Sequence, residues 1–303
     1  MIIAVTGATG IVGRFVCEHF LTKHHTVRGL HRSHSNLDGF GHAPEWIVGD
    51  MQDEEALSTL LAGADAVVHC AFSHVPGRYR GGEGSDLESF WQVNLGGTRR
   101  LLEIARDCEV ERVVLLSSRA VFGRRRAGED VESPIADEHP LWPDSQYGAL
   151  KAAEEAIAGA TRSPIVCALR PTGVYGIGFP VEQSKWYDLV QRVMQGESID
   201  EVRAGTEVHG SDVAAGVECL LAAPAQAVQG HGFNCSDLVV STRDLVRAVA
   251  DCEGLQADLP AASLPVRNPM DCRGLRELGW SPGGESLYLQ TVRELITAVR
   301  ALG

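Results

Sequence analysis

The sequence has no apolar run long enough to cross a bilayer, which takes about 20 residues in a helix. Its hydrophobic runs are short and strand-like, and the first of them spans residues 2–5. No basic region precedes this run, and Gly7 and Gly10 interrupt the apolar stretch too early for a signal peptide. We therefore expect a cytoplasmic protein with no signal peptide and no membrane partner.

The sequence also has no excess of basic residues. It contains 27 lysine and arginine residues and 40 acidic residues, which gives a formal net charge of -13. A protein that binds nucleic acid needs a basic face, so we expect no nucleic-acid partner. The composition, 44% hydrophobic and 22% charged, is that of an ordinary globular protein. A chain of 303 residues suffices for one large domain or two modest ones that share a core.

Paired metal-binding and redox motifs are absent as well. Eight cysteines are scattered without a CxxC pair, and several, such as Cys70 and Cys167, lie in apolar runs. This usage predicts reduced, buried thiols, as in the cytoplasm. Eleven histidines form no HExxH pattern, so we expect no metal site.

Strand-like and helix-like segments do alternate through the first 170 residues. Short β-branched runs predict the strands, and apolar residues at helical spacing predict the helices between them. Such alternation predicts a parallel sheet covered on both faces, a Rossmann-type doubly wound α/β fold. The expected strands are residues 2–5, 26–30, 46–48, 66–70, 113–116 and 165–169, and the expected helices are residues 11–20, 54–61, 95–108 and 147–160.

The composition of the chain changes after Pro171. The predicted helices and strands become shorter there, and glycine and proline become more frequent. We expect residues 1–170 to form the Rossmann domain, completed by a returning segment around residues 206–240. Residues 171–303 then form a smaller, mostly helical C-terminal substrate-binding region. Helices are expected at residues 186–195, 212–222, 242–252 and 286–300, and long loops at residues 72–86 and 124–145.

A glycine-rich turn, Thr6-Gly7-Ala8-Thr9-Gly10-Ile11-Val12-Gly13, follows the first strand and opens the first helix. Glycine permits a tight turn and lets phosphate oxygens approach backbone N–H groups. The helix N-terminus adds partial positive charge. The spacing is GxxGxxG, one residue longer than the standard fingerprint, and in this strand–turn–helix setting it predicts a dinucleotide site.

The end of the second strand bears on the choice between NAD and NADP. An NAD site usually offers an acidic residue to the ribose there, whereas the sequence reads Arg28-Gly29-Leu30-His31-Arg32. Arg32, or alternatively Arg28, can meet a 2′-phosphate. We therefore favour NADP over NAD, and we place Asp50 and Met51, after the third strand, near the adenine.

The candidate catalytic residues are Tyr147 and Lys151, four apart on one helical face, and Ser118, just past the fifth strand. An ammonium near a phenol stabilises the phenolate. Tyr147 can then relay a proton while hydride moves, Lys151 can also hold the nicotinamide ribose, and Ser118 can hydrogen-bond the substrate oxygen.

At this point the chain resembles the extended short-chain dehydrogenases/reductases, also called the NAD-dependent epimerase/dehydratase family. The resemblance covers nearly the whole chain and rests, in order, on Thr6–Gly13, Gly49-Asp50, Val68–Ala71, Val93–Thr98, Leu116–Gly123, Tyr147–Lys151, Leu169–Gly176, Ser211–Ala214 and Leu278–Pro282.

The resemblance implies catalytic roles for Ser118, Tyr147 and Lys151, a bound NAD or NADP, and a homodimer paired through two long helices of the Rossmann domain. It also implies that Ala71, Asn94 and Pro171–Val174 lie near the cofactor. The full set expected at the cofactor is Gly7, Thr9, Gly10, Ile11, Val12, Gly13, His31, Arg32, Asp50, Met51, Cys70, Ala71, Phe72, Asn94, Ser117, Tyr147, Lys151, Pro171, Thr172, Gly173 and Val174.

Several positions depart from the family pattern. Its 4,6-dehydratases carry an Asp-Glu pair directly after the catalytic hydroxyl, where this chain has Arg119 and Ala120. That elimination is therefore not expected. Sugar-nucleotide epimerases often hold the diphosphate with an arginine in an RxGD setting, which neither Arg267 nor Arg273 occupies. Phe122 replaces a common tyrosine.

The weaker substrate candidates are Ser118, Arg119, Trp186 and Arg203, while the run at residues 124–126 is interpreted as a solvated loop. We expect an NAD(P)-dependent oxidoreductase or epimerase that acts on a secondary alcohol or carbonyl carbon of a sugar-like or other small substrate. A reductase and an epimerase remain open. The alternatives are a non-catalytic NAD(P)-binding sensor or regulatory protein on the same fold and, last, a structural protein without cofactor.

Overall fold

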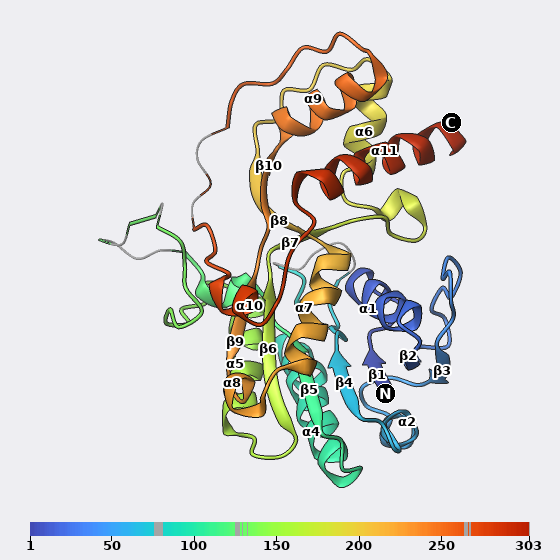
Figure 1. The fold of residues 1–303 in the computed structure, drawn as a ribbon, viewed down its shortest axis with the longest axis vertical. Helices are drawn as coiled ribbons and strands as arrows, with labels where there is room; N and C mark the ends of the chain where they lie inside the picture. Colours follow the sequence, from blue (N-terminus) through green and yellow to red (C-terminus); the bar gives the residue numbers. More distant parts are fainter. Residues whose placement is uncertain are drawn as a thin grey trace.

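Seven strands form one parallel sheet in the order β3-β2-β1-β4-β5-β6-β9 (Figure 1). A computed structural model describes residues 1–75, 81–124, 128, 130–131, 133–263, 266 and 268–302. The strands of this sheet are β1 Ile2–Thr6, β2 Thr26–His31, β3 Glu45–Val48, β4 Ala66–His69, β5 Arg112–Leu116, β6 Ile165–Pro171 and β9 Gly232–Cys235.

Helices cover both faces of the sheet, because neighbouring residues of each strand point to opposite sides. In β5, Val114 packs in one core layer and Val113 in the other. The first layer includes residues of α1 and α7, and the second includes residues of α2, α4 and α5. These helices are α1 Ile11–Thr22, α2 Glu54–Leu61, α4 Gly97–Asp107, α5 Gln146–Ala160 and α7 Gly210–Ala222.

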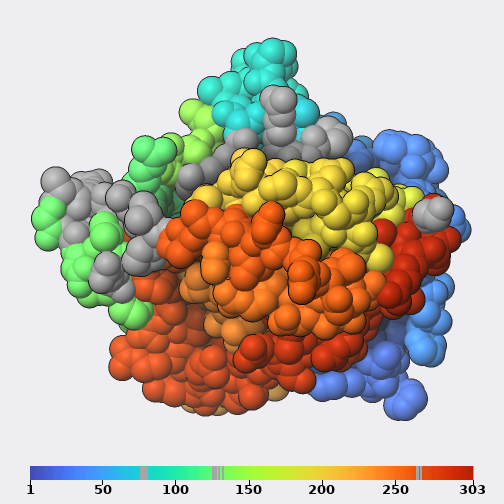
Figure 2. Space-filling view, turned by 90° about the horizontal axis from the view of Figure 1, so that it is seen from above, coloured from blue at the N-terminus to red at the C-terminus, as the bar shows by residue number. Residues whose placement is uncertain are grey.

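A second region stands above the carboxyl edge of the sheet (Figure 1). Its three-stranded sheet has the order β10-β8-β7, with β7 and β8 parallel and β10 antiparallel to β8. Seen from above, the near face consists largely of yellow, orange and red segments, which belong to the C-terminal part of the chain (Figure 2). The elements are β7 Gly173–Tyr175, β8 Ala204–His209, β10 Leu238–Ser241, α6 Tyr187–Met194, α9 Thr242–Glu253 and α11 Gly284–Leu302.

Short helices connect these layers. A π-helical turn, η1, joins α3 to α4, so that residues 87–107 form one uninterrupted helical stretch. None of the helices in the described part of the chain is both long and apolar enough to traverse a bilayer. The remaining elements are α3 Leu87–Trp91, η1 Gln92–Gly96, η2 Arg119–Phe122, η3 Val181–Gln183, α8 Ala225–Val228 and α10 Arg273–Glu277.

The expected α/β fold class is confirmed, while several boundaries differ. Helix α3 begins at Leu87, before the expected start at residue 95, because the Asp86 side chain caps it by accepting a hydrogen bond from Ser89 N at 2.9 Å. Strand β6 extends through Pro171 rather than ending before it. The C-terminal region is helical, as expected, and also contains a small sheet of β7, β8 and β10 that the sequence did not predict, while β9 joins the main sheet within the segment expected to return at residues 206–240.

Candidate active site

The glycine turn packs tightly between the end of β1, the start of α1 and the chain after β4. Gly7 has a φ of +63°, and a Cβ there would lie 2.6 Å from the backbone nitrogen of Ala71. A Cβ at Gly13 would lie 2.1 Å from the carbonyl oxygen of Gly7. Gly10 N donates to that same oxygen at 3.0 Å. Both positions therefore require glycine, as the spacing predicted.

The first turn of α1 has the features of an anion site. Gly10 is the N-cap residue, and no side chain caps the first N–H groups, those of Ile11 and Val12 among them. The Arg14 guanidinium is engaged by the backbone oxygens of Thr9, Asn36 and Asp38. A bare glycine cradle at an uncapped helix N-terminus fits the pyrophosphate of a dinucleotide.

The residues expected at the adenosine end lie after β2 and β3. His31 is buried and packs edge-on against Trp46 at 5.3 Å between ring centroids, while Arg32 is exposed. Asp50 is exposed and accepts a hydrogen bond from Gln52 N at 2.7 Å.

Two further residues near this end have defined neighbours. Met51 packs beside Gly97, where a Cβ would lie 3.0 Å from the Met51 Cβ. Arg28, the alternative to Arg32, donates to Ala62 O at 2.6 Å and pairs with Glu45 at 3.3 Å, so its guanidinium is already engaged.

Tyr147 and Lys151 lie on the first two turns of α5, which Ser145 caps by accepting a hydrogen bond from Gly148 N. The Phe72 ring contacts both of them. Its centroid is 5.0 Å from that of Tyr147 and 5.3 Å from Lys151 Nζ. Since Phe72 follows Ala71, which packs on Gly7, Tyr147 and Lys151 stand beside the glycine turn.

Ser118 is joined to the same helix through Ala120. The Ser118 hydroxyl accepts a hydrogen bond from Ala120 N at 3.1 Å and caps η2. On its other side, the Ala120 carbonyl oxygen lies so close to α5 that a Cβ at Gly148 would be 2.3 Å from it. Ser118 and Tyr147 therefore belong to two elements in direct contact.

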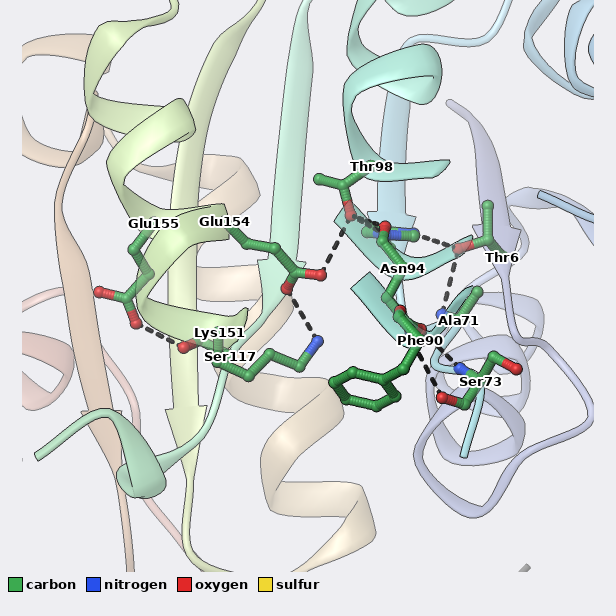
Figure 3. A network of polar contacts seen from close by, with 11 residues as sticks. Thr6, Ala71, Ser73, Phe90, Asn94, Thr98, Ser117, Lys151, Glu154 and Glu155 are labelled. Atoms are coloured by element: carbon green, nitrogen blue, oxygen red, sulfur yellow. Dashed lines mark hydrogen bonds and ion pairs between the residues drawn. The ribbon is translucent and has the colours of Figure 1, made fainter. Parts of the chain in front are cut away.

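Lys151 is almost fully enclosed, with 4% of its side chain exposed, and donates to Glu154 at 2.9 Å (Figure 3). Burial lowers the pKa of Lys151, but Glu154 and Tyr147 raise it, and the net pKa lies above its ordinary value. The lysine is thus a buried cation with an adjacent counter-charge. Desolvation raises the pKa of the nearby Cys70 thiol to about 12, which makes this cysteine unreactive.

Other residues expected at the cofactor make contacts within the protein. The Ser117 hydroxyl donates to Glu155, and the Asn94 amide holds the loop after β4 by accepting from Ser73 N at 2.7 Å and donating to Ser73 O at 3.0 Å (Figure 3). The Thr172 hydroxyl donates to that of Ser236 at 3.2 Å.

Strand β7 contributes the last expected cofactor residues, Gly173 and Val174, which follow Pro171 at the end of β6. Gly173 is paired with Glu207 of β8, and a Cβ at Gly173 would lie 2.3 Å from the carboxylate of that residue. The expected residues after β1, β4, β5 and β6 thus gather at the carboxyl edge of the sheet.

The substrate candidates are separated. Arg119 reaches β8, where its guanidinium donates to the Thr206 hydroxyl at 3.2 Å. Trp186 stacks on Tyr175 at 5.0 Å between ring centroids, inside the C-terminal region, and Arg203 is exposed at the start of β8. Residues 125, 126 and 267, three arginines considered above, lie outside the described part of the chain.

Sequence reasoning missed the buried polar residues behind the site. Glu154 and Glu155 are 2% and 8% exposed, and His69 is 2% exposed. Two adjacent acids on a helix otherwise rich in alanine, facing the sheet, were the available signal. Charged residues are rarely buried unless they are paired, so their partners could have been sought among nearby polar side chains.

A parallel sheet with a glycine turn at its switch point and a helix bearing tyrosine and lysine beside that turn defines a dinucleotide-binding α/β protein. The model of the NAD dependent epimerase/dehydratase family matches residues 3–236. The chain belongs to this family, whose members depend on NAD(P) and include reductases, dehydrogenases and epimerases.

Curated proteins with different names are similar to this chain in sequence. A putative dihydroflavonol 4-reductase of Synechocystis is 26% identical over 291 residues, which cover 93% of this chain and 80% of that protein. A 2-alkyl-3-oxoalkanoate reductase of Stenotrophomonas maltophilia is 34% identical over 203 residues, which cover 65% of this chain and 57% of that protein. Reductases with different substrates in their names thus resemble this chain.

Solved structures show the same fold over the whole chain. UDP-glucose 4-epimerase of Thermus thermophilus, solved in complex with NAD, superposes with a TM-score of 0.75 at 23% identity over 100% of both chains. A short-chain dehydrogenase/reductase superfamily protein of Agrobacterium tumefaciens with bound NAD has a TM-score of 0.74 at 25% identity, covering 100% of this chain and 98% of that one.

Proposed function

We propose that the protein transfers hydride, with NAD(P), at a secondary alcohol or carbonyl carbon of a sugar-like or other small substrate. The observation that carries this proposal is the contact of both Tyr147 and Lys151 with Phe72, next to the residue that packs on Gly7. An acid–base group and a buried cation therefore stand at the edge of the sheet where this fold binds its ligands.

The residues divide the work in the following way. A bound nicotinamide supplies or accepts the hydride. Tyr147 moves a proton between its Oη and the substrate oxygen, and Lys151 supplies positive charge beside that phenol. Ser118 donates a hydrogen bond to the substrate oxygen, and the N-terminus of α1 holds the pyrophosphate.

The polar groups beyond Ser118 support a substrate that carries hydroxyl or other polar groups. Arg119 bonds to Thr206, and Lys185 forms an ion pair with Glu207 next to Gly173. A few fixed polar groups at the mouth of a site give orientation and specificity. Because Arg119 and Ala120 follow Ser118, no carboxylate stands where a 4,6-dehydratase carries its acidic pair, and we do not propose that elimination.

We also propose that NADP is preferred over NAD. Arg32 is exposed directly after β2, where an NAD site would offer a carboxylate, and Arg28 is engaged with Ala62 and Glu45. Calorimetry with each dinucleotide should give tighter binding of NADP, and Arg32→Ala should remove the difference. An exposed arginine elsewhere, Arg106→Ala, is the control. Equal binding of NADP and NAD by the unaltered protein would contradict the preference.

The experiment for the main proposal is a screen of sugars, polyols and keto compounds, read by absorbance of the reduced cofactor over many turnovers. A sustained change indicates a reductase or dehydrogenase, whereas product without net change indicates an epimerase. Tyr147→Phe should abolish turnover while calorimetry still detects dinucleotide binding. Unchanged turnover in this variant would refute the role of Tyr147. Dinucleotide binding without turnover of any substrate by the unaltered protein would favour a non-catalytic sensor.

We also propose a homodimer, because the family resemblance implies pairing through two long helices of the Rossmann domain. We take these helices to be α4 and α5. The two helices are neighbours in this chain, since the Thr98 hydroxyl of α4 donates to Glu154 of α5 at 3.1 Å. Light scattering should give twice the chain mass of 32.6 kDa. A mass of one chain at micromolar concentration would refute the pairing.

A further inference from the structure

A buried row of hydrogen bonds runs from Lys151 across three elements to the end of β1 (Figure 3). Glu154 accepts from Lys151 Nζ at 2.9 Å and from the Thr98 hydroxyl at 3.1 Å. His69 Nε2 lies 3.0 Å from the Thr98 hydroxyl, and His69 Nδ1 lies 2.7 Å from that of Thr6. All five side chains belong to buried residues.

One arrangement of the hydrogens along this row directs every donor toward Glu154. Burial lowers the pKa of His69 to about 3, so the ring is neutral and carries a single N–H. The Thr6 oxygen accepts from Ala71 N at 3.3 Å, and in this arrangement its hydroxyl hydrogen is donated to His69 Nδ1. His69 is then protonated on Nε2 and donates to Thr98. Every bond in the row therefore points toward the Glu154 carboxylate.

The Thr98 hydroxyl has a second acceptor, the carbonyl of Asn94 at 3.1 Å, one helical turn earlier. Its single hydrogen is shared between this neutral oxygen and the carboxylate of Glu154. A bond to a charged acceptor is about twice as strong as a bond between neutral groups. The link from Thr98 to Glu154 is therefore the favoured one.

The groups that face Lys151 come from two elements. Glu154 and Tyr147 lie on α5, and His69, Cys70 and the Phe72 ring come from β4 and the residues after it. Glu154 provides the only carboxylate paired with Lys151 among the described residues. The next residue, Glu155, faces Ser117 instead (Figure 3).

We propose that Glu154 is a positioning residue that holds the Lys151 ammonium in place beside Tyr147 and, through Thr98 and His69, ties it to Thr6 at the glycine turn. The catalytic meaning of this role rests on the proposed function, whereas the physical link between the two charges does not. A buried ammonium without this partner would lose its proton more readily.

The chain offers a direct test because it has only three lysines, Lys23, Lys151 and Lys185. With 13C at the lysine Cε, a pH titration by NMR follows three signals, which Lys23→Arg and Lys185→Arg assign. In Glu154→Gln the midpoint of the Lys151 signal should move to lower pH by about one unit or more.

The control is Glu103→Gln, which removes a carboxylate from an exposed pair on α4. It should leave the Lys151 midpoint unchanged. If Glu154→Gln weakens the fold but leaves that midpoint where it was, Glu154 is merely structural and the proposal fails. If Glu154→Gln does not fold, adding Lys151→Met should restore folding by removing the unpaired charge. No restoration would overturn the proposal.

The direction of the hydrogen bonds through His69 can be measured separately. Nitrogen-15 spectra, assigned with His69→Gln, should show His69 neutral and protonated on Nε2 from pH 5 to 9. Protonation on Nδ1 would reverse the row, because His69 Nε2 would then take the Thr98 hydrogen from Glu154, and the link from Glu154 through His69 would be overturned. These measurements need no substrate, so their failure is distinct from that of the proposed function, which the Tyr147→Phe turnover assay decides.

Discussion

Arg170 and Glu155 form a charged pair with 6% and 7% of their side chains exposed. The guanidinium donates to the carboxylate at 2.7, 3.0 and 3.2 Å and to the carbonyl of Asp137 at 2.7 Å. Removing one partner of such a pair leaves the other charge buried without compensation, which costs more than the pair itself contributes. This pair joins α5, and with it Tyr147 and Lys151, to strand β6.

At the scale of the residue, we therefore expect Glu155→Gln to lower the free energy of unfolding by about 3–5 kcal/mol. Urea denaturation of both proteins measures this change in the free energy of unfolding. The matched control is again Glu103→Gln, whose partner Arg99 is 65% exposed, so that water replaces the lost contact. A loss for Glu155→Gln no larger than that of the control would contradict the account of the pair as buried and interdependent.

At the scale of the element, the approach of α5 to η2 depends on Gly148. A Cβ at this position would lie 2.3 Å from the Ala120 oxygen and 3.1 Å from the Pro143 Cβ. Gly148→Ala should push the first turn of α5 away from η2 and separate Tyr147 from Ser118. We expect turnover to fall by about tenfold or more and the free energy of unfolding by about 1–3 kcal/mol.

The same helix supplies the control. At Gly159 a Cβ would lie 3.9 Å from its nearest neighbour, an ordinary contact. Since glycine within a helix is less stable than alanine, Gly159→Ala should raise the free energy of unfolding by about 0.5–1 kcal/mol and leave turnover unchanged. If both glycine variants behave alike, close packing at Gly148 does not position the site.

Some strands could be predicted from the sequence and others could not. The six expected strands of the parallel sheet are apolar runs flanked by turns, and the pattern alone located them. Strand β9 is only four residues long and β7 three, and each is defined by pairing with a distant segment. Such pairing leaves no local signal, which is why these strands were missed.

The site shows the same division. Gly7, Tyr147 and Lys151 could be selected as candidates from the sequence, because the proposed chemistry requires fixed residue types at fixed spacing in the chain. The link between Glu154 and His69 could not be predicted, because these residues are 85 positions apart in sequence and are connected through Thr98 of a third element. Their role depends on burial, which only the folded chain determines.

At the scale of the whole molecule, Asp212 joins the helices over the sheet to the C-terminal region. It lies in the first turn of α7 and accepts from Gly283 N with both carboxylate oxygens at 3.1 Å, just before α11. Its backbone oxygen accepts from Trp280 Nε1 at 2.8 Å. Burial, with a smaller effect of Asp237, raises the pKa of Asp212 from 3.8 to about 6.

This raised pKa makes stability depend on pH in a definite direction. Between pH 3.8 and about 6 the native state binds more protons than the unfolded state, so the contribution of Asp212 is lost as the pH rises through this window. An asparagine side chain at this position cannot ionise but still offers an oxygen to Gly283. Asp212→Asn should therefore match the unaltered protein near pH 4 and be more stable than it above pH 6.

Urea denaturation at a series of pH values from 4 to 7 measures this difference, with the exposed Asp200→Asn as the control that should show no growing gap. Asp137, whose pKa is also raised, has the same charged neighbours in every variant and cancels in the comparison. A gap that is constant across the range would mean that Asp212 ionises alike in both states. Its carboxylate would then join the two regions without any cost of burying charge.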